Sequence, residues 1–530
     1  MPHMSAILRS VFSISAATVL SRATGYVRLS AQAAVLGVGA VADAYGLAVL
    51  LPSLIYELFM GGILYSIFIP VLVDRMTTYG EEDARRLTNA LFTIVLPLMA
   101  VIALIGIVFA GPLVALVGDW GSSSDLSPEE VRRAEEYAVL FFRVFALQML
   151  FYGVSTIATG VLQAHRHFFL PTFAPVLNNL IVIASFVAYF LMKNANPSLA
   201  LYVLAFGVTV GVAVMALALV PTLLALGYRP RPRVGHPALM PTARLAGPMV
   251  VLVAASVGFQ LLAAHLATGF GAYAELTYAF TIFSLPYGIF VVAIVTALMP
   301  ELSEKHSRGD EEGYRDTLSF GLRTMVFVVV PSAVGMITLS EPIVGLLYQR
   351  LNFDAEATQR VATLLVAYSV GLLGYSAYFF LVRAFYSRQN TRTPAVLNVA
   401  IFGLYAALAY IFSALFQAVG VVLALSVAYA VLAALGLVAT RREIKRIDGR
   451  RLLNSLVRIL AAGAVMYAVA LAGTTLLGTG SGFLERLFIL IVAGSVSLAA
   501  YLGSAFLLRV EELRSVVVLL RRRRAAKADG

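Results

Sequence analysis

The sequence has no cysteine, a single tryptophan and six histidines, and only 13% of its 530 residues are charged. Without thiols the chain can form no disulfide, thiolate metal site or iron–sulfur cluster, and it has no cysteine nucleophile. The histidines are scattered and show no metal-ligand spacing, so we expect no metal and no cofactor. No predicted loop exceeds about 20 residues, which leaves no room for a soluble domain that carries separate chemistry.

Apolar sequence fills the chain instead. Hydrophobic residues make up 60% of it and the mean hydropathy is +0.89, whereas soluble domains are about 45 to 50% apolar. Windows of about 20 apolar residues can be placed about fourteen times, so we expect an all-α polytopic membrane protein. Short breaks at 37–41, 270–273 and 417–420 split runs that are too long for one span. The first apolar run has no convincing cleavage site and is interpreted as a retained helix.

Charge is distributed as in a membrane protein and not as in a nucleic-acid-binding protein. The net charge of +11 comes from Lys and Arg in loops and at the C-terminus, which predicts that both termini are cytoplasmic. The acidic loop from Asp119 to Glu130 then lies outside. The run Arg521 to Arg524 fits either contact with anionic membrane lipids or a plain positively charged stop after the last helix.

Two motifs recur in the second half of the chain. Phe68-Ile69-Pro70-Val71-Leu72 returns as Leu298-Met299-Pro300-Glu301-Leu302, and Val176-Leu177-Asn178 returns as Val396-Leu397-Asn398. A repeat of six helices keeps its orientation in the membrane, so we expect two pseudo-symmetric lobes, as in transporters. The expected divisions are an N-lobe at 1–228 (helices one to six), a C-lobe at 229–440 (seven to twelve), two further helices at 441–510 and a basic cytoplasmic tail at 511–530.

Two arginines interrupt the first predicted span, Arg22 and Arg28. Each costs about 2.5 to 3.5 kcal/mol at mid-bilayer unless it faces water, a partner or an anionic cargo. On a straight helix they lie roughly 120° apart, and Gly25 between them could permit a bend. We therefore predict that both bind an anionic substrate. The alternative is that Arg28 reaches the interface and Arg22 pairs with Asp43 or Glu57.

Short motifs run through the first twelve predicted helices. They are Ser21-Arg22-x-x-Gly25-x-x-Arg28, Ala42-Asp43-Ala44-Tyr45, Leu51-Pro52, the two proline motifs of the repeat, and Leu285-Pro286-Tyr287-Gly288. Together they resemble the MurJ/MviN family of the multidrug/oligosaccharidyl-lipid/polysaccharide exporter superfamily, which also has two trailing helices. The resemblance implies a lipid II flippase of the bacterial cytoplasmic (inner) membrane. Such a flippase moves an undecaprenyl-diphosphate-linked peptidoglycan precursor by alternating access, with membrane lipids and cell-wall synthesis proteins as partners.

The chain departs from the family pattern at two cationic positions. Tyr56-Glu57 stands where an arginine usually precedes Glu-Gly, and Thr281 stands where helix eight usually has an arginine. The open alternatives are an exporter of another lipid-linked oligosaccharide, a drug/cation antiporter of the superfamily, or a non-transporting scaffold paralogue. A polyprenyl-phosphate glycosyltransferase would need an acidic residue in a long first external loop, and the break at 37–41 has none, so we expect no enzyme.

The remaining intramembrane polar residues have weaker assignments. Asp43 and Glu57 are candidates for gating or charge pairing with the arginines, although Asp43 also suits a helix cap. Arg143 and His265 are candidates for additional cavity residues, with snorkelling as the alternative for Arg143.

Other polar residues are expected to have structural roles. Snorkelling is expected for Arg323 and Arg383. Asn178, Asn179 and Asn398 are expected to form interhelical hydrogen bonds.

Overall fold

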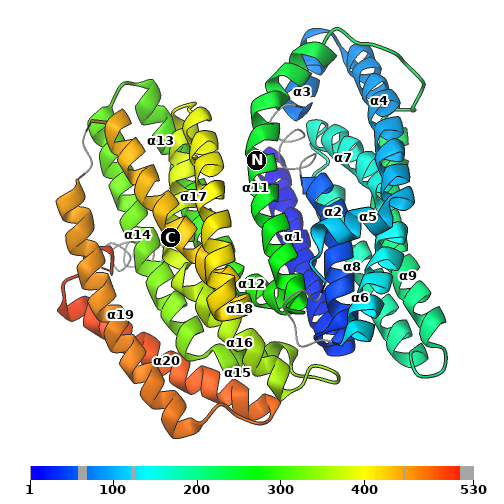
Figure 1. Ribbon diagram of the computed structural model, residues 1–530. Helices are drawn as coiled ribbons and strands as arrows, with labels where there is room; N and C mark the ends of the chain where they lie inside the picture. Colours follow the sequence, from blue (N-terminus) through cyan, green and yellow to red (C-terminus); the bar gives the residue numbers. More distant parts are fainter. Residues whose placement is uncertain (1, 58–67, 121–126, 446–447, 514–530) are drawn as a thin grey trace. The chain divides into compact units, whose positions relative to one another are not determined.

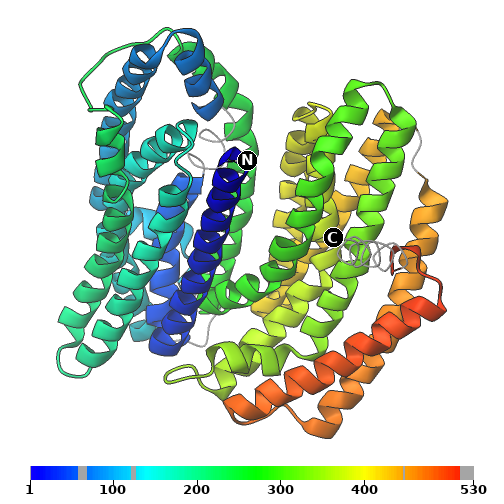
Figure 2. The same cartoon turned by 180° about the vertical axis from the view of Figure 1, so that it is seen from behind.

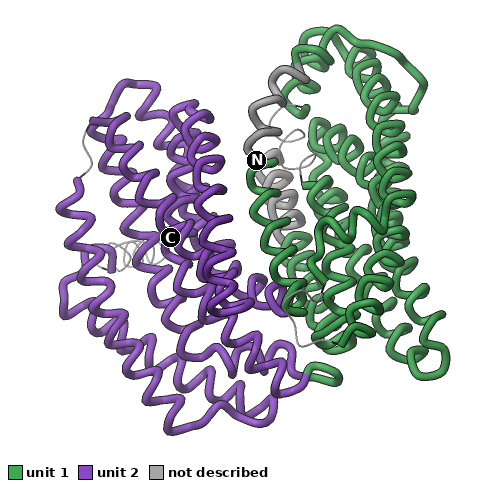
Figure 3. Tube along the Cα trace, viewed as in Figure 1, with its two compact units in different colours: residues 1–274, 350–353 green, residues 275–349, 354–530 purple. Residues whose placement is uncertain are grey.

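The structure, a computed structural model, describes residues 2–57, 68–120, 127–445 and 448–513; within these ranges it leaves out the side chains of 2–15 and 242–252. Every secondary-structure element in the described ranges is a helix (Figure 1). The all-α fold expected from composition is therefore confirmed. Packing divides the chain into two compact units (Figure 3), and each is described by itself.

Unit 1 comprises residues 1–274 and the short segment 350–353. Its helices are α1 (Pro2–Leu36), α2 (Ala40–Glu57), α3 (Ile69–Thr78), α4 (Glu81–Val108), α5 (Ala110–Val117), α6 (Pro128–Phe145), α7 (Gln148–Ala164), α8 (Phe169–Met192), α9 (Pro197–Leu217), α10 (Val220–Ala225) and α11 (Leu239–Gly269).

Unit 2 comprises residues 275–349 and 354–530. Its helices are α12 (Tyr273–Pro286), which begins at the boundary, the π-helix η2 (Tyr287–Val291), α13 (Val292–Ser307), α14 (Glu311–Thr338), α15 (Ser340–Tyr348), α16 (Ala355–Val370), α17 (Leu372–Ser387), α18 (Arg392–Glu443), α19 (Gly449–Leu477) and α20 (Phe483–Leu507).

The three predicted breaks between closely spaced spans are confirmed. Helix α1 ends before Gly37, α11 ends before Phe270, and α18 changes direction at Gln417, which has a φ of 52°. A positive φ at a residue with a side chain interrupts the regular helical path. Each break thus separates two helical segments that the continuous apolar run alone would have predicted to be a single helix.

Nine described helices are long and apolar enough to cross a membrane, and the number rises to eleven if two bent pairs each count as one span. This count takes α18 as one helix on both sides of Gln417 and does not include α1 or α11. The chain is therefore a multi-span membrane protein, and the figure of about fourteen spans stays a prediction.

Helix breaks recur in both halves of the chain. The pair α6 and α7 bends by 40°, and the pair α16 and α17 bends by 49°. Likewise α4 gives way to α5 at Phe109, and α14 gives way to α15 at Leu339. The recurrence agrees with the two-fold repeat read from the sequence. Packing places α11 with unit 1, so the contact-based boundary at 274 differs from the repeat-based division at 228; that division stays a prediction.

The segment 350–353 is joined to unit 1 through the end of α1. The backbone N–H of Asn352 donates to the carbonyl of Ala34 at 3.0 Å, and its side-chain amide donates to the carbonyl of Val35 at 2.5 Å. These carbonyls belong to the last turn of α1, where no intrahelical donor remains for them. Next to them Gly37 has a φ of +66°, and a Cβ there would lie 2.6 Å from the carbonyl oxygen of Asn352. Glycine is therefore required at this turn.

In unit 2, α19 packs along α14 and α20 packs along α15 (Figures 1 and 2). Their common core includes Phe327 of α14, Ile459 of α19 and Tyr501 of α20. The hydroxyl of Tyr501 donates to the carbonyl of Phe327 at 2.7 Å. Arg323 is 5% exposed and pairs with the carboxylates of Glu511 and Glu512, which follow α20. Snorkelling of Arg323 to the membrane surface stays a prediction.

Candidate functional site in unit 1

Arg22 and Arg28 both lie on α1, which runs as one α-helix from Pro2 to Leu36. Gly25 stays inside this helix, so the two side chains leave it in directions that differ by roughly 120°. Arg22 is exposed and Arg28 is half-buried. The two guanidinium groups therefore lie on different sides of α1 and offer two separate points of contact. They do not converge on a single point.

Asn179 of α8 fixes α1 at the turn that carries Arg22. Its amide donates to Thr24 Oγ1 at 3.1 Å and to the carbonyl of Ser21 at 3.4 Å. A Cβ at Gly25 would lie 3.5 Å from the Asn179 amide nitrogen, an ordinary van der Waals distance, so this approach of α8 does not require glycine. The interhelical bond predicted for Asn179 is confirmed, while Asn178 Oδ1 is buried and has no hydrogen-bond partner among the described residues. Asn179 thus sets the rotation of α1 about its axis.

Arg28 lies within electrostatic range of the phenol groups of Tyr45 in α2 and Tyr152 in α7. Tyr152 is held from two sides: its hydroxyl donates to Gln148 Oε1 at 3.3 Å, and its ring packs against that of Tyr56 in a tilted arrangement with the ring centres 4.4 Å apart. Gln148 is held in turn, because its amide donates to Thr209 Oγ1 at 3.3 Å. Phenol hydroxyls and guanidinium groups are hydrogen-bond donors, and an anionic oxygen can accept from both.

The hydrogen bonds that link Tyr152, Gln148 and Thr209 lie next to the bend between α6 and α7. At the interruption at residues 146–147, the carbonyl of Val144 accepts from the backbone N–H of Leu147 at 3.3 Å and also from Thr209 Oγ1 at 3.2 Å. Sequence reasoning missed Tyr152, Gln148 and Thr209. The available signal was a glutamine within an otherwise apolar run, which needs a partner when it is buried.

Neither arginine is neutralised by a carboxylate within the ranges that the structure describes. Arg22, Arg28 and Glu57 take part in no ion pair there, and Glu57 is exposed at the end of α2. An intramembrane arginine without a counter-charge is costly unless water or an anion reaches it. The expected pairing of these arginines with Asp43 or Glu57 is thus absent from the described contacts, and a role of the two carboxylates in gating stays a prediction.

Asp43 caps a helix, but not the helix on which it lies. The side chain is 2% exposed, and its Oδ1 accepts from the backbone N–H of Ala274 at 2.7 Å. Ala274 is in the first turn of α12, where backbone N–H groups lack intrahelical acceptors. The sequence suggested either a gate pair or a helix cap for Asp43, and the geometry supports a cap. The capped helix is α12, whereas a cap on α2 was expected from the sequence.

Arg143 and His265 lie on other helices of unit 1. Arg143 is exposed in the last turn of α6 and forms no ion pair in the described ranges. His265 is half-buried in α11, and its Nδ1 is buried with no hydrogen-bond partner in the part of the chain that the structure describes. No described contact joins either residue to Arg22 or Arg28, so a shared cavity stays a prediction. The described residues contain no group of three or more His, Cys, Asp or Glu side chains placed to hold a metal ion.

Comparisons with known proteins bear on the whole chain. Residues 32–493 match the family model described as "Lipid II flippase MurJ". The "Lipid II flippase MurJ" of Burkholderia cenocepacia is 28% identical over 79% of this chain and 81% of its own length. The "Probable lipid II flippase MurJ" of Bdellovibrio bacteriovorus is 28% identical over 96% of both chains.

Solved structures show the same fold. A lipid II flippase MurJ in an inward closed conformation superposes with a TM-score of 0.75 at 21% identity, over 94% of this chain and 98% of its own. An inward-facing multidrug resistance MATE transporter of the MOP superfamily gives 0.66 at 15% identity, over 81% of this chain and 98% of its own. The family model, which covers most of the sequence, shows that the chain belongs to the lipid II flippase MurJ family.

Proposed function

We propose that the chain is a flippase that moves lipid II, or a closely related polyprenyl-diphosphate-linked precursor, across the bacterial cytoplasmic membrane. The observation that carries this proposal is the pair Arg22 and Arg28 on α1, which have no carboxylate partner in the described ranges. A diphosphate that leaves water needs fixed donors, and guanidinium groups supply them in a planar fork. The phenol groups of Tyr45 and Tyr152 lie within electrostatic range of Arg28, and the Tyr152 hydroxyl is already donated to Gln148.

The mechanism proposed is alternating access, as the family implies, with both termini cytoplasmic. The diphosphate would bind to Arg22 and Arg28 from the cytoplasmic side, and the polyprenyl tail would stay in the lipid. Such a protein binds and releases its cargo unchanged, and no catalytic step is required of it. Cell-wall synthesis proteins are the expected partners.

A second candidate is an exporter of another lipid-linked oligosaccharide. This candidate is favoured by Tyr56-Glu57 and Thr281, because these residues occupy positions at which the MurJ/MviN family usually has arginines. A cation antiporter is disfavoured, because a cation-binding site needs carboxylates and the charges on α1 are positive.

Complementation tests the proposal directly. Cells depleted of their own lipid II flippase should grow when they express this chain, and should lyse when they express Arg22→Ala or Arg28→Ala at the same membrane level. Immunoblots of membrane fractions provide the matched control for insertion. Failure of the wild-type chain to support growth, with normal amounts in the membrane, would favour the second candidate or a non-transporting scaffold.

A further inference from the structure

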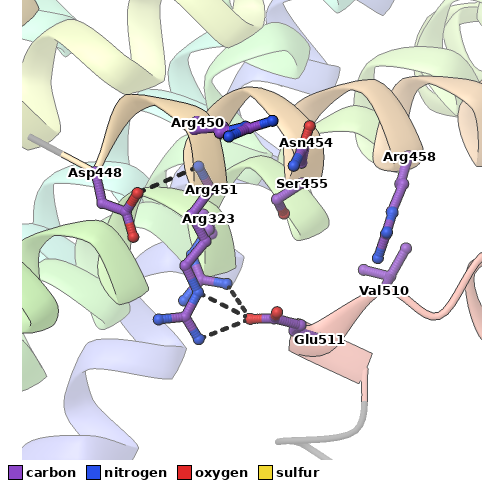
Figure 4. A pocket seen from close by; sticks show the side chains of 9 residues that line it. All are labelled: Arg323, Asp448, Arg450, Arg451, Asn454, Ser455, Arg458, Val510 and Glu511. Atoms are coloured by element: carbon purple, nitrogen blue, oxygen red, sulfur yellow. Dashed lines mark hydrogen bonds and ion pairs between the residues drawn. The ribbon is translucent and has the colours of Figure 1, made fainter.

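Unit 2 contains a polar pocket at one end of its last two helices (Figure 4). The pocket has a volume of about 290 Å³ and lies between α14, the first turns of α19 and the segment that follows α20. Since α19 begins at Gly449 and α20 ends at Leu507, this end of both spans is expected at the membrane surface. We therefore expect the pocket at the depth of lipid headgroups.

Positive charge predominates in this pocket. Four guanidinium groups line it against two carboxylates, those of Asp448 and Glu511. Glu511 is already engaged, since its Oε2 accepts from Arg323 Nη1 at 2.8 Å and from Arg451 Nη2 at 2.8 Å. The guanidinium groups of Arg450 and Arg458 form no ion pair within the described ranges. Arg458 Nη1 donates to the carbonyl of Arg509 at 3.2 Å, and its remaining N–H groups, like those of Arg450, can donate to a further anion.

Two buried polar groups on the pocket wall lack partners. Ser455 is 8% exposed and its Oγ has no hydrogen-bond partner among the described residues; the same holds for Nε of Arg323, which is 5% exposed. Buried donors without acceptors are costly, and they are rare in proteins unless water or a ligand satisfies them. The pocket thus offers unused donors in addition to its charge.

An apolar pocket adjoins the polar one. It has a volume of about 540 Å³ and lies between α14, α17, α18 and α19, and it shares Arg323 and Ser455 with the polar pocket. The rest of its lining is mostly leucine, alanine and valine side chains, for example Leu373, Ala430 and Leu452, and it also includes Arg441. A cationic pocket that adjoins an apolar one matches a ligand with an anionic head and a hydrocarbon chain.

We propose that this pair of pockets binds an anionic phospholipid of the membrane leaflet at that end of α19. The phosphate lies between Arg450, Arg458 and Ser455, and an acyl chain enters the apolar pocket. A soluble phosphate would make no use of the adjoining apolar walls. A zwitterionic phospholipid brings no net charge to the cationic lining. The site lies entirely within unit 2 and does not depend on Arg22 or Arg28.

Native mass spectrometry of the full chain in detergent tests this proposal with phosphatidylglycerol and with phosphatidylcholine of the same acyl chains. We expect phosphatidylglycerol to stay bound to the wild type and phosphatidylcholine to dissociate. Arg450→Gln and Arg458→Gln should each weaken phosphatidylglycerol binding about fivefold. Arg442→Gln is the matched control, because Arg442 is an exposed arginine near the end of α18 that lines neither pocket. Ser455→Phe, which fills the junction of the pockets, should abolish binding. The smaller change Ser455→Ala should weaken it where the larger one prevents folding.

Several results would overturn the proposal. Equal retention of phosphatidylglycerol by the wild type and by the doubly substituted Arg450→Gln, Arg458→Gln chain would do so, as would equal retention of the two lipids by the wild type. Displacement of bound phosphatidylglycerol by excess inorganic phosphate alone would identify a site for a soluble anion. Co-purification of a polyprenyl diphosphate, lost in the same two variants, would identify the cargo as the occupant. Complementation by these variants reports separately on the proposed function.

Discussion

The carboxylate of Asp43 accepts a hydrogen bond from the backbone N–H of Ala274 at 2.7 Å, across 231 positions of sequence. Both residues are buried, at 2% and 1% exposure. Where a capped amide is shielded from water, loss of the cap leaves the amide without any acceptor. This bond therefore fixes the point at which the chain leaves unit 1.

Replacing Asp43 with alanine is expected to destabilise the protein by about 1 to 3 kcal/mol, the cost of a buried amide left unsatisfied. Asparagine keeps an oxygen acceptor and should restore most of the loss. Asp354→Ala is the matched control: Asp354 caps α16 by accepting from Ala357 N at 2.8 Å, but it is exposed, so water can replace it. The melting temperature in detergent provides the comparison. Equal losses for Asp43→Ala and Asp354→Ala would contradict this account.

Gly37 and Gly39 form a second matched pair. Both have a positive φ, +66° for Gly37 and +107° for Gly39. A Cβ added at Gly37 would lie 2.6 Å from the carbonyl oxygen of Asn352, whereas a Cβ added at Gly39 would have no neighbour within 4 Å. Alanine at either position costs about 1 to 2 kcal/mol of backbone strain. Gly37→Ala adds a steric clash with the backbone of Asn352, so it should lower the melting temperature further. A smaller effect at Gly37 than at Gly39 would mean that segment 350–353 does not pack there.

Asn179 should matter for cargo affinity more than for folding. Its bonds to Thr24 and Ser21 are interhelical, and such bonds contribute about 0.6 kcal/mol on average. Asn179→Ala should leave the melting temperature almost unchanged but weaken lipid II binding several-fold, because α1 is then free to rotate its arginines. A double-mutant cycle with Thr24→Val should show coupling between the two sites. Asn178→Ala, one residue away, is the control. An equal loss of lipid II binding in Asn178→Ala would mean that Asn179 does not position α1.

Stability should depend on pH through Glu511. Hydrogen bonds and the positive charge of Arg451, with a contribution from Arg323, hold the pKa of Glu511 below its ordinary value of 4.5. A carboxylate with a lowered pKa in the folded state stabilises that state at pH values above the unfolded pKa, and this stability is lost as the pH falls through the folded pKa. The wild type should therefore melt higher than Glu511→Gln at pH 7, and the difference should shrink below about pH 4.5. A difference that stays constant from pH 7 to pH 3 would contradict the ion pair.

The sequence predicted the helices better than it predicted their partners. Apolar runs and short polar breaks are local, so the ends of α1 and α11 and the break at Gln417 could be placed. The bend between α6 and α7 was missed because residues 146–147 are alanine and leucine, and neither glycine nor proline marks the break. Helix breaks of this kind follow from tertiary contacts, here those of Gln148 and Thr209.

The candidate site shows the same division. Arg22 and Arg28 could be found from sequence alone, because a charge inside an apolar span is costly wherever it points. The partner of Asp43 could not, since nothing local distinguishes the amide of Ala274 from any other helix start. The partners of Arg323 could not be predicted for the same reason: its carboxylates, Glu511 and Glu512, lie almost 190 positions away, and only the fold brings them together.

The most direct measurement of the central claim is lipid II translocation by purified protein in proteoliposomes. The account predicts that Arg22→Ala and Arg28→Ala each lower the rate by about 10- to 100-fold, the value of a charged hydrogen bond to the cargo. Lysine at either position should restore part of the rate, because it keeps the charge and loses the planar fork. Arg132→Ala, at an exposed arginine paired with Glu136 in α6, should translocate like the wild type. Wild-type rates in both α1 alanine variants would contradict the claim that these two arginines bind the diphosphate.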